Sequence, residues 1–240
     1  MNSSAKEEQM RVVFVHGACV RDGAWWWHRT EALLRDRGVP SRAPLLPSCG
    51  ETGRPAGHEG PEFSDDVTAV RGVLADSPEP TVVVAHSYGG IVTAEAATGM
   101  PWVRRMVLIS SYLPEIGESL STFGGPEPAP FLDPDLANGT FGVRPEFLAG
   151  TFLQDCPDVA DDAAKRLARQ TLSVVGQPVS AAAWKQVPTT YVVCARDRGT
   201  PAEAQRRFAE RADEVLELDT GHHPFLSQPD AVAHLLTSTT

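Results

Sequence analysis

The sequence predicts an α/β protein built on a mostly parallel β-sheet with helices on both faces. Apolar segments rich in β-branched residues, such as 11–15, 81–84 and 103–109, alternate with segments whose apolar residues recur at helical spacing. This alternation is typical of a parallel sheet, because each connection between parallel strands must cross one of its faces. One long segment, 112–187, interrupts the alternation and predicts a helical cap inserted into the sheet domain.

The composition is that of a soluble globular protein. The chain has 240 residues, of which 42% are hydrophobic and 22% charged, enough for one α/β domain with an insertion. The formal net charge of -10 disfavours nucleic acid and anionic membranes as partners, because both repel an acidic surface. No apolar run approaches the ~20 residues that a membrane-spanning helix needs. We therefore expect neither partner, and no feature of the sequence indicates an oligomeric state.

The amino terminus and the cysteines favour a cytoplasmic protein. Residues 1–10 lack the apolar core of a secretory signal and are expected to form a short disordered lead-in. The cysteines show no CxxC spacing and no histidine at metal-ligand spacing, which predicts free thiols in a reducing compartment: Cys19, Cys49, Cys156 and Cys194. Arginine far outnumbers lysine, which favours a GC-rich bacterial source.

The first half of the sheet domain alternates between strand and helix. Residues 11–15 form a predicted buried strand, and residues 24–37 follow as a helix with an apolar stripe. A short strand is expected over 41–46, and the segment 47–61 is a loop because it is full of glycine, proline and serine. An amphipathic helix over 63–75 then leads to the next strand.

The alternation continues on either side of the insertion. Before it come a helix and a strand, over 91–99 and 103–109. After it come two further pairs of strand and helix, over 189–195, 201–211, 215–218 and 231–236. This order is that of successive parallel crossover units.

The insertion itself has a different character. Proline and glycine are frequent, no stretch has a strand signal, and two stretches predict helices, over 145–153 and 160–172. We expect the sheet domain to comprise residues 11–111 and 188–240, with the helical cap over residues 112–187.

Ser87 lies between a predicted strand and a predicted helix, in the arrangement small-x-Ser-x-Gly that is typical of a nucleophile elbow. Such a turn is so tight that the serine is strained, and the positions two before and two after it need small side chains. Ala85 and Gly89 meet that need. The serine would stand exposed at the end of its strand, with the backbone N–H of Tyr88 free to point at an oxyanion.

Two further loops carry groups that suit a serine nucleophile. Asp197 follows one predicted strand and His222 follows the next. Reactive residues of such sheets gather beyond the carboxyl ends of the strands, so these loops are expected to converge on Ser87. A serine hydroxyl needs an imidazole to take its proton, and the imidazole needs a carboxylate to hold it. The order nucleophile, acid, base is also the one that α/β-hydrolases have.

Other residues compete for these roles. His223 is the alternative base, and His222 is preferred because Gly-His is the usual placement of the hydrolase base. Asp219 and Glu115 are alternative acids, of which Asp219 precedes the histidine too closely to face it comfortably. His86 lies within the elbow and is expected to point beneath the end of the sheet, which indicates a packing role.

Taken together, these motifs resemble the α/β-hydrolase superfamily, and within it the branch of small plant esterases and hydroxynitrile lyases with its bacterial relatives. The resemblance implies that the residue after His16-Gly17 contributes a second oxyanion N–H, which falls on Ala18 and would act together with Tyr88. The resembling segments span nearly the whole core and leave only the cap unmatched: Val-His-Gly-Ala-Cys19, Gly-Ala-Trp-Trp-Trp27, Ala-His-Ser-Tyr-Gly-Gly90, Pro-Thr-Thr-Tyr-Val-Val-Cys-Ala-Arg-Asp197 and Gly-His-His-Pro-Phe-Leu-Ser-Gln-Pro229.

Three departures from that family's pattern bear on function. Ala85 stands where glycine is usual, and its small side chain is expected to fit. Residues 20–22 make the loop after Cys19 longer than in the plant esterases, which is expected to alter the mouth of the pocket. Hydroxynitrile lyases of this branch carry a lysine directly after the catalytic histidine, so His223 at that position counts against a lyase.

The motifs favour a serine hydrolase that cleaves a small carboxylic ester, lactone or thioester through an acyl-enzyme on Ser87, with no metal or organic cofactor. The alternatives are a cofactor-free lyase, dehydratase, cyclase or acyltransferase of a bacterial natural-product pathway on the same fold, or a ligand-binding receptor-like protein. We expect an apolar or aromatic small-molecule substrate, and the candidate pocket residues are Trp25, Tyr112, Trp184 and Phe225.

Overall fold

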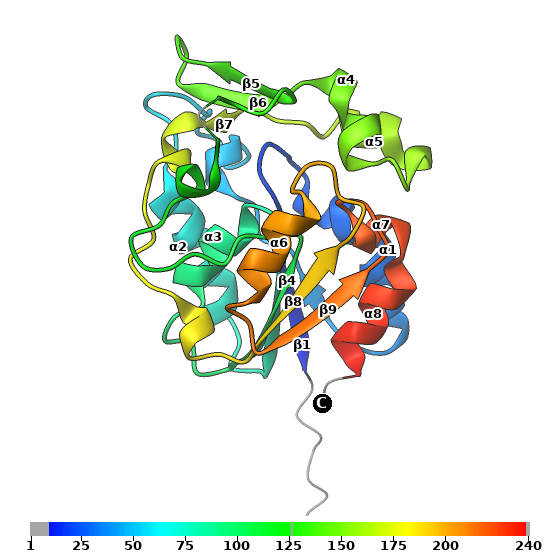
Figure 1. Ribbon diagram of the computed structural model, residues 1–240. Coiled ribbons are helices and arrows are strands. Elements are labelled where there is room, and N and C mark those ends of the chain that lie inside the picture. The colour runs from blue at the N-terminus through cyan, green and yellow to red at the C-terminus, as the bar shows by residue number, and fades with distance from the viewer. Residues whose placement is uncertain (1–9, 126, 239–240) are drawn as a thin grey trace, which may run out of the picture.

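The computed structural model describes residues 10–125 and 127–238 and has a six-stranded sheet at its centre (Figure 1). All neighbouring strands are parallel, in the order β2-β1-β3-β4-β8-β9. The strands are β1 (Arg11–Val15), β2 (Ser41–Arg42), β3 (Thr81–His86), β4 (Val103–Ile109), β8 (Thr189–Cys194) and β9 (Glu214–Leu218). Every residue of β1 and β3 is buried, as expected for central strands covered on both faces.

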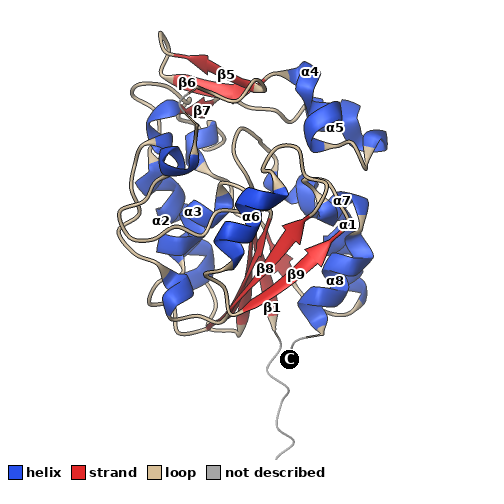
Figure 2. Ribbon diagram, viewed as in Figure 1, coloured by secondary structure: helices blue, strands red, loops and turns tan. Residues whose placement is uncertain are grey.

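Helices cover both faces of the sheet, which confirms the predicted fold class (Figure 2). Alternate residues of β1 supply the two cores. Val13 and Val15 pack on one face against α2 (Phe63–Ala75), α3 (Gly89–Ala96) and α6 (Ala202–Ala209). Val12 and Phe14 pack on the other face against α1 (Gly23–Asp36), α7 (Pro224–Ser227) and α8 (Pro229–Thr237).

The insertion differs from its prediction. The sequence predicted no strands over residues 112–187, but three short antiparallel strands form a second sheet: β5 (Leu132–Asp135), β6 (Thr140–Val143) and β7 (Gln170–Thr171). A tight turn joins the first two, in which Asn138 hydrogen-bonds to Asp135 and Gly139 has a φ of 66°. The expectation of an insertion without strands is therefore wrong.

The first helix predicted for the insertion is confirmed, because α4 (Pro145–Phe147) continues as a π-helix over Leu148–Phe152. The second, α5 (Ala160–Ala164), is shorter than predicted, because turns and β7 occupy the rest of the expected stretch. In Figure 1 these helices and β5 to β7 lie beyond the carboxyl ends of the central strands, over the edge where a site is expected. The boundaries of the cap stay a prediction.

Apart from Met10, the predicted lead-in over residues 1–10 lies outside the described residues. Across the described ranges, no helix is both long enough and apolar enough to cross a membrane. All four cysteines are buried free thiols, as predicted. A cytoplasmic location stays a prediction.

Candidate active site

The turn after β3 has the strained geometry that the sequence predicted. Ser87 has a φ of 50°, in the left-handed region that residues with a side chain rarely adopt. A Cβ atom built on Gly89 would lie 2.5 Å from the carbonyl oxygen of Val15, so only glycine fits there without a shift of the backbone. Gly17 approaches the turn from the neighbouring loop, and a Cβ atom on it would lie 3.1 Å from that of Ser87.

Asp197 and His222 meet at the carboxyl edge of the sheet. Oδ2 of Asp197 lies 2.7 Å from Nδ1 of His222, and both side chains are buried. The backbone N–H groups of Gly199 and Thr200 donate to Oδ1 of Asp197 at 2.7 and 3.0 Å. Burial alone would raise the pKa of this carboxyl, but the charge and hydrogen bond of His222 and the hydrogen bond from Ser110 lower it. Asp197 is therefore an ionised, fixed partner for the imidazole.

Two side chains that the sequence analysis missed also hold Asp197. Ser110, directly after β4, donates its hydroxyl hydrogen to Oδ2 of Asp197, and its Oγ lies 3.1 Å from Nδ1 of His222. Gln205 of α6 is fully buried and donates from Nε2 to the same carboxylate oxygen at 3.1 Å. The available signal for Ser110 was a polar residue directly after an apolar strand. Its partner depends on β4 lying beside β8, which the sequence does not reveal.

The Ser87 side chain and the imidazole of His222 line the same cavity. Within residues 10–125 and 127–238, no hydrogen bond joins the two side chains, and the Nδ1 atom of His222 is engaged by Asp197. The hydrogen bond between a nucleophile and its base is often long before the substrate binds. The structure thus brings Asp197 and His222 together, and the contact between His222 and Ser87 stays a prediction.

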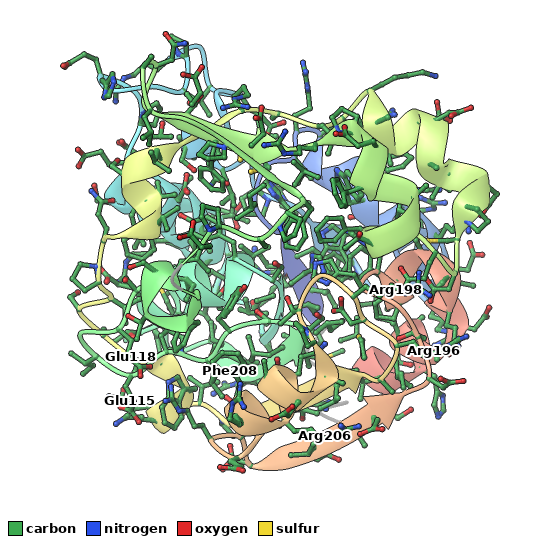
Figure 3. All side chains as sticks on the ribbon, turned by 45° about the horizontal axis from the view of Figure 1, so that its top comes forward. Glu115, Glu118, Arg196, Arg198, Arg206 and Phe208 are labelled. Carbon is green, nitrogen blue, oxygen red and sulfur yellow. The ribbon has the colours of Figure 1, made fainter. Side chains whose placement is uncertain are left out.

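Neither rival acid faces a histidine. Glu115 pairs with Lys185 at 2.5 Å, and Asp219 pairs with Arg196 at 2.9 Å. Both Glu115 and Arg196 lie toward the edges of the molecule in Figure 3. The carboxylate that meets His222 is that of Asp197.

His86 and His223 pack around His222. His86 donates from Nε2 to the carbonyl oxygen of His222 at 3.0 Å, and His223 donates from Nδ1 to that of Phe152 at 3.0 Å. Burial, with the nearby His222, lowers the pKa of His223 to about 3 and that of His86 well below its usual range. Both rings are therefore neutral at pH 7.

The same three histidines are the only group in the described part of the chain that is placed to hold a metal ion. One ring nitrogen of each lies within 4.8 Å of the other two. Nitrogen ligands of a zinc ion lie roughly 2.0–2.1 Å from the metal, and four of them surround it as a tetrahedron. A spacing as wide as 4.8 Å exceeds what that geometry allows, so the rings would have to move to bind a metal ion.

Two backbone N–H groups beside Ser87 are unengaged. Ala18 and Tyr88 both line the cavity, and neither of their N–H groups donates a hydrogen bond within the described ranges. The next residue of the first loop, Cys19, has a φ of 60°, and its own N–H donates to Oε1 of Gln170 at 2.9 Å. Both N–H groups are thus free to donate to a bound ligand, and their role as oxyanion donors stays a prediction.

The cavity has a volume of about 890 Å³ and extends from Ser87 into the insertion. Tyr112 and Phe225 line it, as the sequence analysis expected. Much of the wall is aromatic, including Phe123, Phe131, Phe141 and Phe152.

Two of the predicted pocket residues do not line this cavity. The ring of Trp25 lies under the guanidinium group of Arg166, 4.3 Å from its central carbon, and Trp184 donates its indole N–H to the carbonyl oxygen of Pro114 at 2.8 Å. α1 instead turns Trp26 and Trp27 toward the cavity. The three consecutive tryptophans 25–27 were evident from the sequence, but which of them faces the cavity depends on the rotation of α1 about its axis.

The chain is similar in sequence and in fold to several known proteins. A family model described as "Alpha/beta hydrolase family" matches residues 12–235. Polyneuridine aldehyde esterase from Rauvolfia serpentina is 28% identical over an alignment of 270 positions, which covers 98% of this chain and 98% of that protein. Methylesterase 7 from Arabidopsis thaliana is 27% identical over an alignment of 260 positions, which covers 96% of this chain and 96% of that protein. A pyrethroid hydrolase from Sphingobium faniae JZ-2 shares the fold, with a TM-score of 0.82 at 22% identity over 95% of this chain and 96% of that chain.

Proposed function

This chain belongs to the alpha/beta hydrolase family, and from that premise we propose that it cleaves a small-molecule ester, lactone or thioester through an acyl-enzyme on Ser87. Relatives named as an esterase and a methylesterase support carboxylic ester hydrolysis in general. The observation that carries the proposal is the buried hydrogen bond between Asp197 and His222, at the same cavity as a strained serine.

In the first half of the proposed reaction, Oγ of Ser87 attacks the carbonyl carbon of the substrate while Nε2 of His222 takes the hydroxyl proton. Asp197 holds the ring and stabilises its positive charge. The tetrahedral intermediate then collapses, the bond to the leaving alcohol or thiol breaks, and the imidazolium returns the proton to that group.

In the second half, a water molecule attacks the acyl carbon and gives a proton to His222. The bond between the acyl carbon and Oγ of Ser87 breaks, the proton returns to Oγ, and the carboxylic acid leaves. In both halves the N–H groups of Ala18 and Tyr88 hold the oxyanion. One such donor is worth about 10²–10³ in kcat.

The cavity favours a bulky, uncharged substrate. Its volume of about 890 Å³ is near the upper end of small-molecule sites, roughly 300–1,000 Å³. Two of the charged residues that line it pair with each other, since Arg211 lies 2.7 Å from Glu118. The aromatic walls support an apolar or aromatic ester-like molecule.

The proposal is tested by the intact mass of the protein after treatment with a small fluorophosphonate. We expect one phosphonyl adduct on the wild type and none on Ser87→Ala. Ser121→Ala is the matched control, because Ser121 also lines the cavity but has no place in the proposed reaction. It should react like the wild type.

Folded wild-type protein that forms no adduct would contradict the proposal and favour non-hydrolytic chemistry or ligand binding on the same fold. An adduct followed by turnover of a panel of esters, lactones and thioesters of increasing acyl size would support it. The same panel would identify the substrate class.

A further inference from the structure

The loop between β1 and α1, residues 16–22, is bound by the insertion over its second half, residues 19–22. Its segment 19–21 pairs antiparallel with the segment 166–168, through two backbone hydrogen bonds of 2.9 Å and a bridge between Val20 and Leu167. The two hydrogen bonds run from the N–H of Arg21 to the carbonyl of Arg166 and from the N–H of Ala168 to the carbonyl of Cys19.

An ion pair fixes the outer end of this pairing. Nε of Arg166 lies 2.9 Å from Oδ2 of Asp22, and the guanidinium group of Arg166 stacks over the ring of Trp25. Asp22 has a φ of 58°, in the left-handed region. The insertion therefore contacts the loop at a position that the backbone of the loop alone would not favour.

Gln170 holds the inner end of the same loop. Its side chain is fully buried, and its Oε1 accepts the N–H of Cys19 at 2.9 Å. Its Nε2 donates to Oγ of Ser48 at 2.8 Å. One amide from the insertion thus connects the loop of Ala18 to a buried polar network beneath it.

That network ends at the phenol hydroxyl of Tyr88, the residue whose backbone N–H is the second proposed oxyanion donor. Oγ of Ser48 donates to Oδ2 of Asp66 at 2.6 Å, and the hydroxyl of Tyr88 donates to the same oxygen at 2.8 Å. Asp66 has no exposed surface. A continuous chain of hydrogen bonds therefore runs from Cys19 through Gln170, Ser48 and Asp66 to Tyr88.

Cys19 explains why such support is needed. Its φ of 60° is unfavourable for a residue with a side chain, and a conformation of this kind persists only when its surroundings fix it. The peptide that Gln170 holds joins the carbonyl of Ala18 to the N–H of Cys19. Holding this peptide fixes the chain directly after Ala18, whose own N–H belongs to the peptide before it.

We propose that Gln170 is a positioning residue for the proposed reaction, and that it fixes the loop of Ala18 and, through Ser48 and Asp66, the ring of Tyr88, so that both N–H groups meet the oxyanion. This inference rests on the proposed function. It makes the insertion part of the machinery that stabilises the transition state, in addition to forming the wall of the cavity.

The test compares ester hydrolysis by the wild type, Gln170→Met and Gln177→Met. Gln177 is the matched control, because its Oε1 also accepts one backbone N–H, that of Phe63 at 2.8 Å, away from the cavity wall. For Gln170→Met we expect kcat to fall at least about tenfold while KM stays within about twofold, since oxyanion donors act in the transition state. Gln177→Met should keep kcat within about twofold of the wild type.

A trifluoromethyl ketone analogue of the ester gives a second readout, because its adduct with serine places an oxyanion against the same donors. Its inhibition constant should weaken for Gln170→Met in proportion to kcat and stay unchanged for Gln177→Met. If Gln170 only stabilised the fold, Gln170→Met would lower the melting temperature, as Gln177→Met would, and would leave kcat of the folded fraction intact. That result would overturn the inference.

If Gln170→Met does not fold, the outer contact supplies the test. Arg166→Met removes the ion pair to Asp22, whereas Arg144→Met, the control, removes only contacts of Arg144 within the insertion, to Leu132 and Asp133. We expect kcat to fall severalfold for Arg166→Met alone, and unchanged kcat would overturn the inference. The proposed function fails separately, if Ser87→Ala retains ester hydrolysis.

Discussion

At the scale of single residues, Asp197 is held by more donors than His222 alone supplies. Its Oδ2 is approached by Ser110, Gln205 and His222, while two backbone N–H groups hold Oδ1. Each donor stabilises the ionised carboxylate, and together they leave it one orientation. In the proposed reaction that carboxylate orients the imidazole of His222, so the donors to the carboxylate act on catalysis indirectly.

The first prediction concerns Ser110→Ala. The change removes a hydrogen bond to a buried carboxylate, worth roughly 1.5–3 kcal/mol, and we expect kcat to fall about tenfold with little change in KM. Steady-state kinetics with an ester substrate provide the measurement. Ser121→Ala is the control at the cavity wall. An unchanged kcat would show that Gln205 and the backbone donors suffice to hold Asp197.

The sequence predicted which residues carry reactive groups but not everything that holds them. Asp197 and His222 follow successive strands, and parallel strands bring such loops to one edge, so their meeting was predictable. The contact of Ser110 with Asp197 requires the pairing of β4 with β8, which brings together residues 87 positions apart. The exclusion of Trp25 from the cavity depends on the rotation of α1, which three consecutive tryptophans leave ambiguous.

At the scale of elements, the junction of β3 with α3 is packed against β1 without spare room. Gly89 begins α3, and its Cα faces the carbonyl oxygens of Val15 and His16. A Cβ atom at position 89 would clash with these oxygens, and backbone atoms cannot rotate away from it as a side chain can.

The second prediction is that Gly89→Ala lowers the free energy of unfolding by about 1–3 kcal/mol and displaces Ser87, with a matching loss of fluorophosphonate reactivity. Gly72→Ala is the control on the exposed side of α2, where an added Cβ atom meets nothing within 4 Å. Helix propensity should make that variant up to about 1 kcal/mol more stable. Urea denaturation measures both, and equal stability of the two variants would contradict the steric argument.

The elements of the insertion were the least predictable. Leu132–Asp135 contains a proline and two aspartates, which are poor strand formers, and it is held in place by pairing with β6 across a tight turn. Gln170–Thr171 is a strand of two residues that also pairs with β6. The second of these strands depends on a partner distant in sequence, whereas the first pairs with its neighbour in a hairpin. The central strands β1, β3, β4 and β8 were predictable because they are apolar and separated by regular helices. The strand expected over 41–46 is only Ser41–Arg42 in the structure.

At the scale of the whole molecule, the chain buries histidines that stay neutral. Burial lowers the pKa of His16 to about 4 and that of His223 to about 3. In the unfolded chain these rings titrate near pH 6.5, so below that value the unfolded chain binds protons that the folded protein does not. The contribution of these neutral rings to the free energy of unfolding is complete above pH 6.5 and is lost as the pH falls toward their pKa values in the folded protein.

The third prediction follows from this sign. Between pH 7 and pH 5, His223 alone should cost the wild type about 2 kcal/mol of unfolding free energy, which His223→Gln should not lose. Denaturation curves at both pH values give the difference. His234→Gln is the control on the exposed face of α8, and its pH dependence should match that of the wild type. A His223→Gln variant as acid-sensitive as the wild type would contradict a neutral buried ring.

The pairing of segment 19–21 with segment 166–168 has a consequence for protein engineering. Grafting the insertion of one family member onto the sheet of another is an obvious route to a new substrate range. In this chain such a chimaera would also exchange the partners of Cys19 and Ser48, because Gln170 belongs to the grafted piece. The unit of exchange that keeps the pairing intact is the insertion together with residues 16–22. On the proposed role of Gln170, exchanging the two together would preserve turnover.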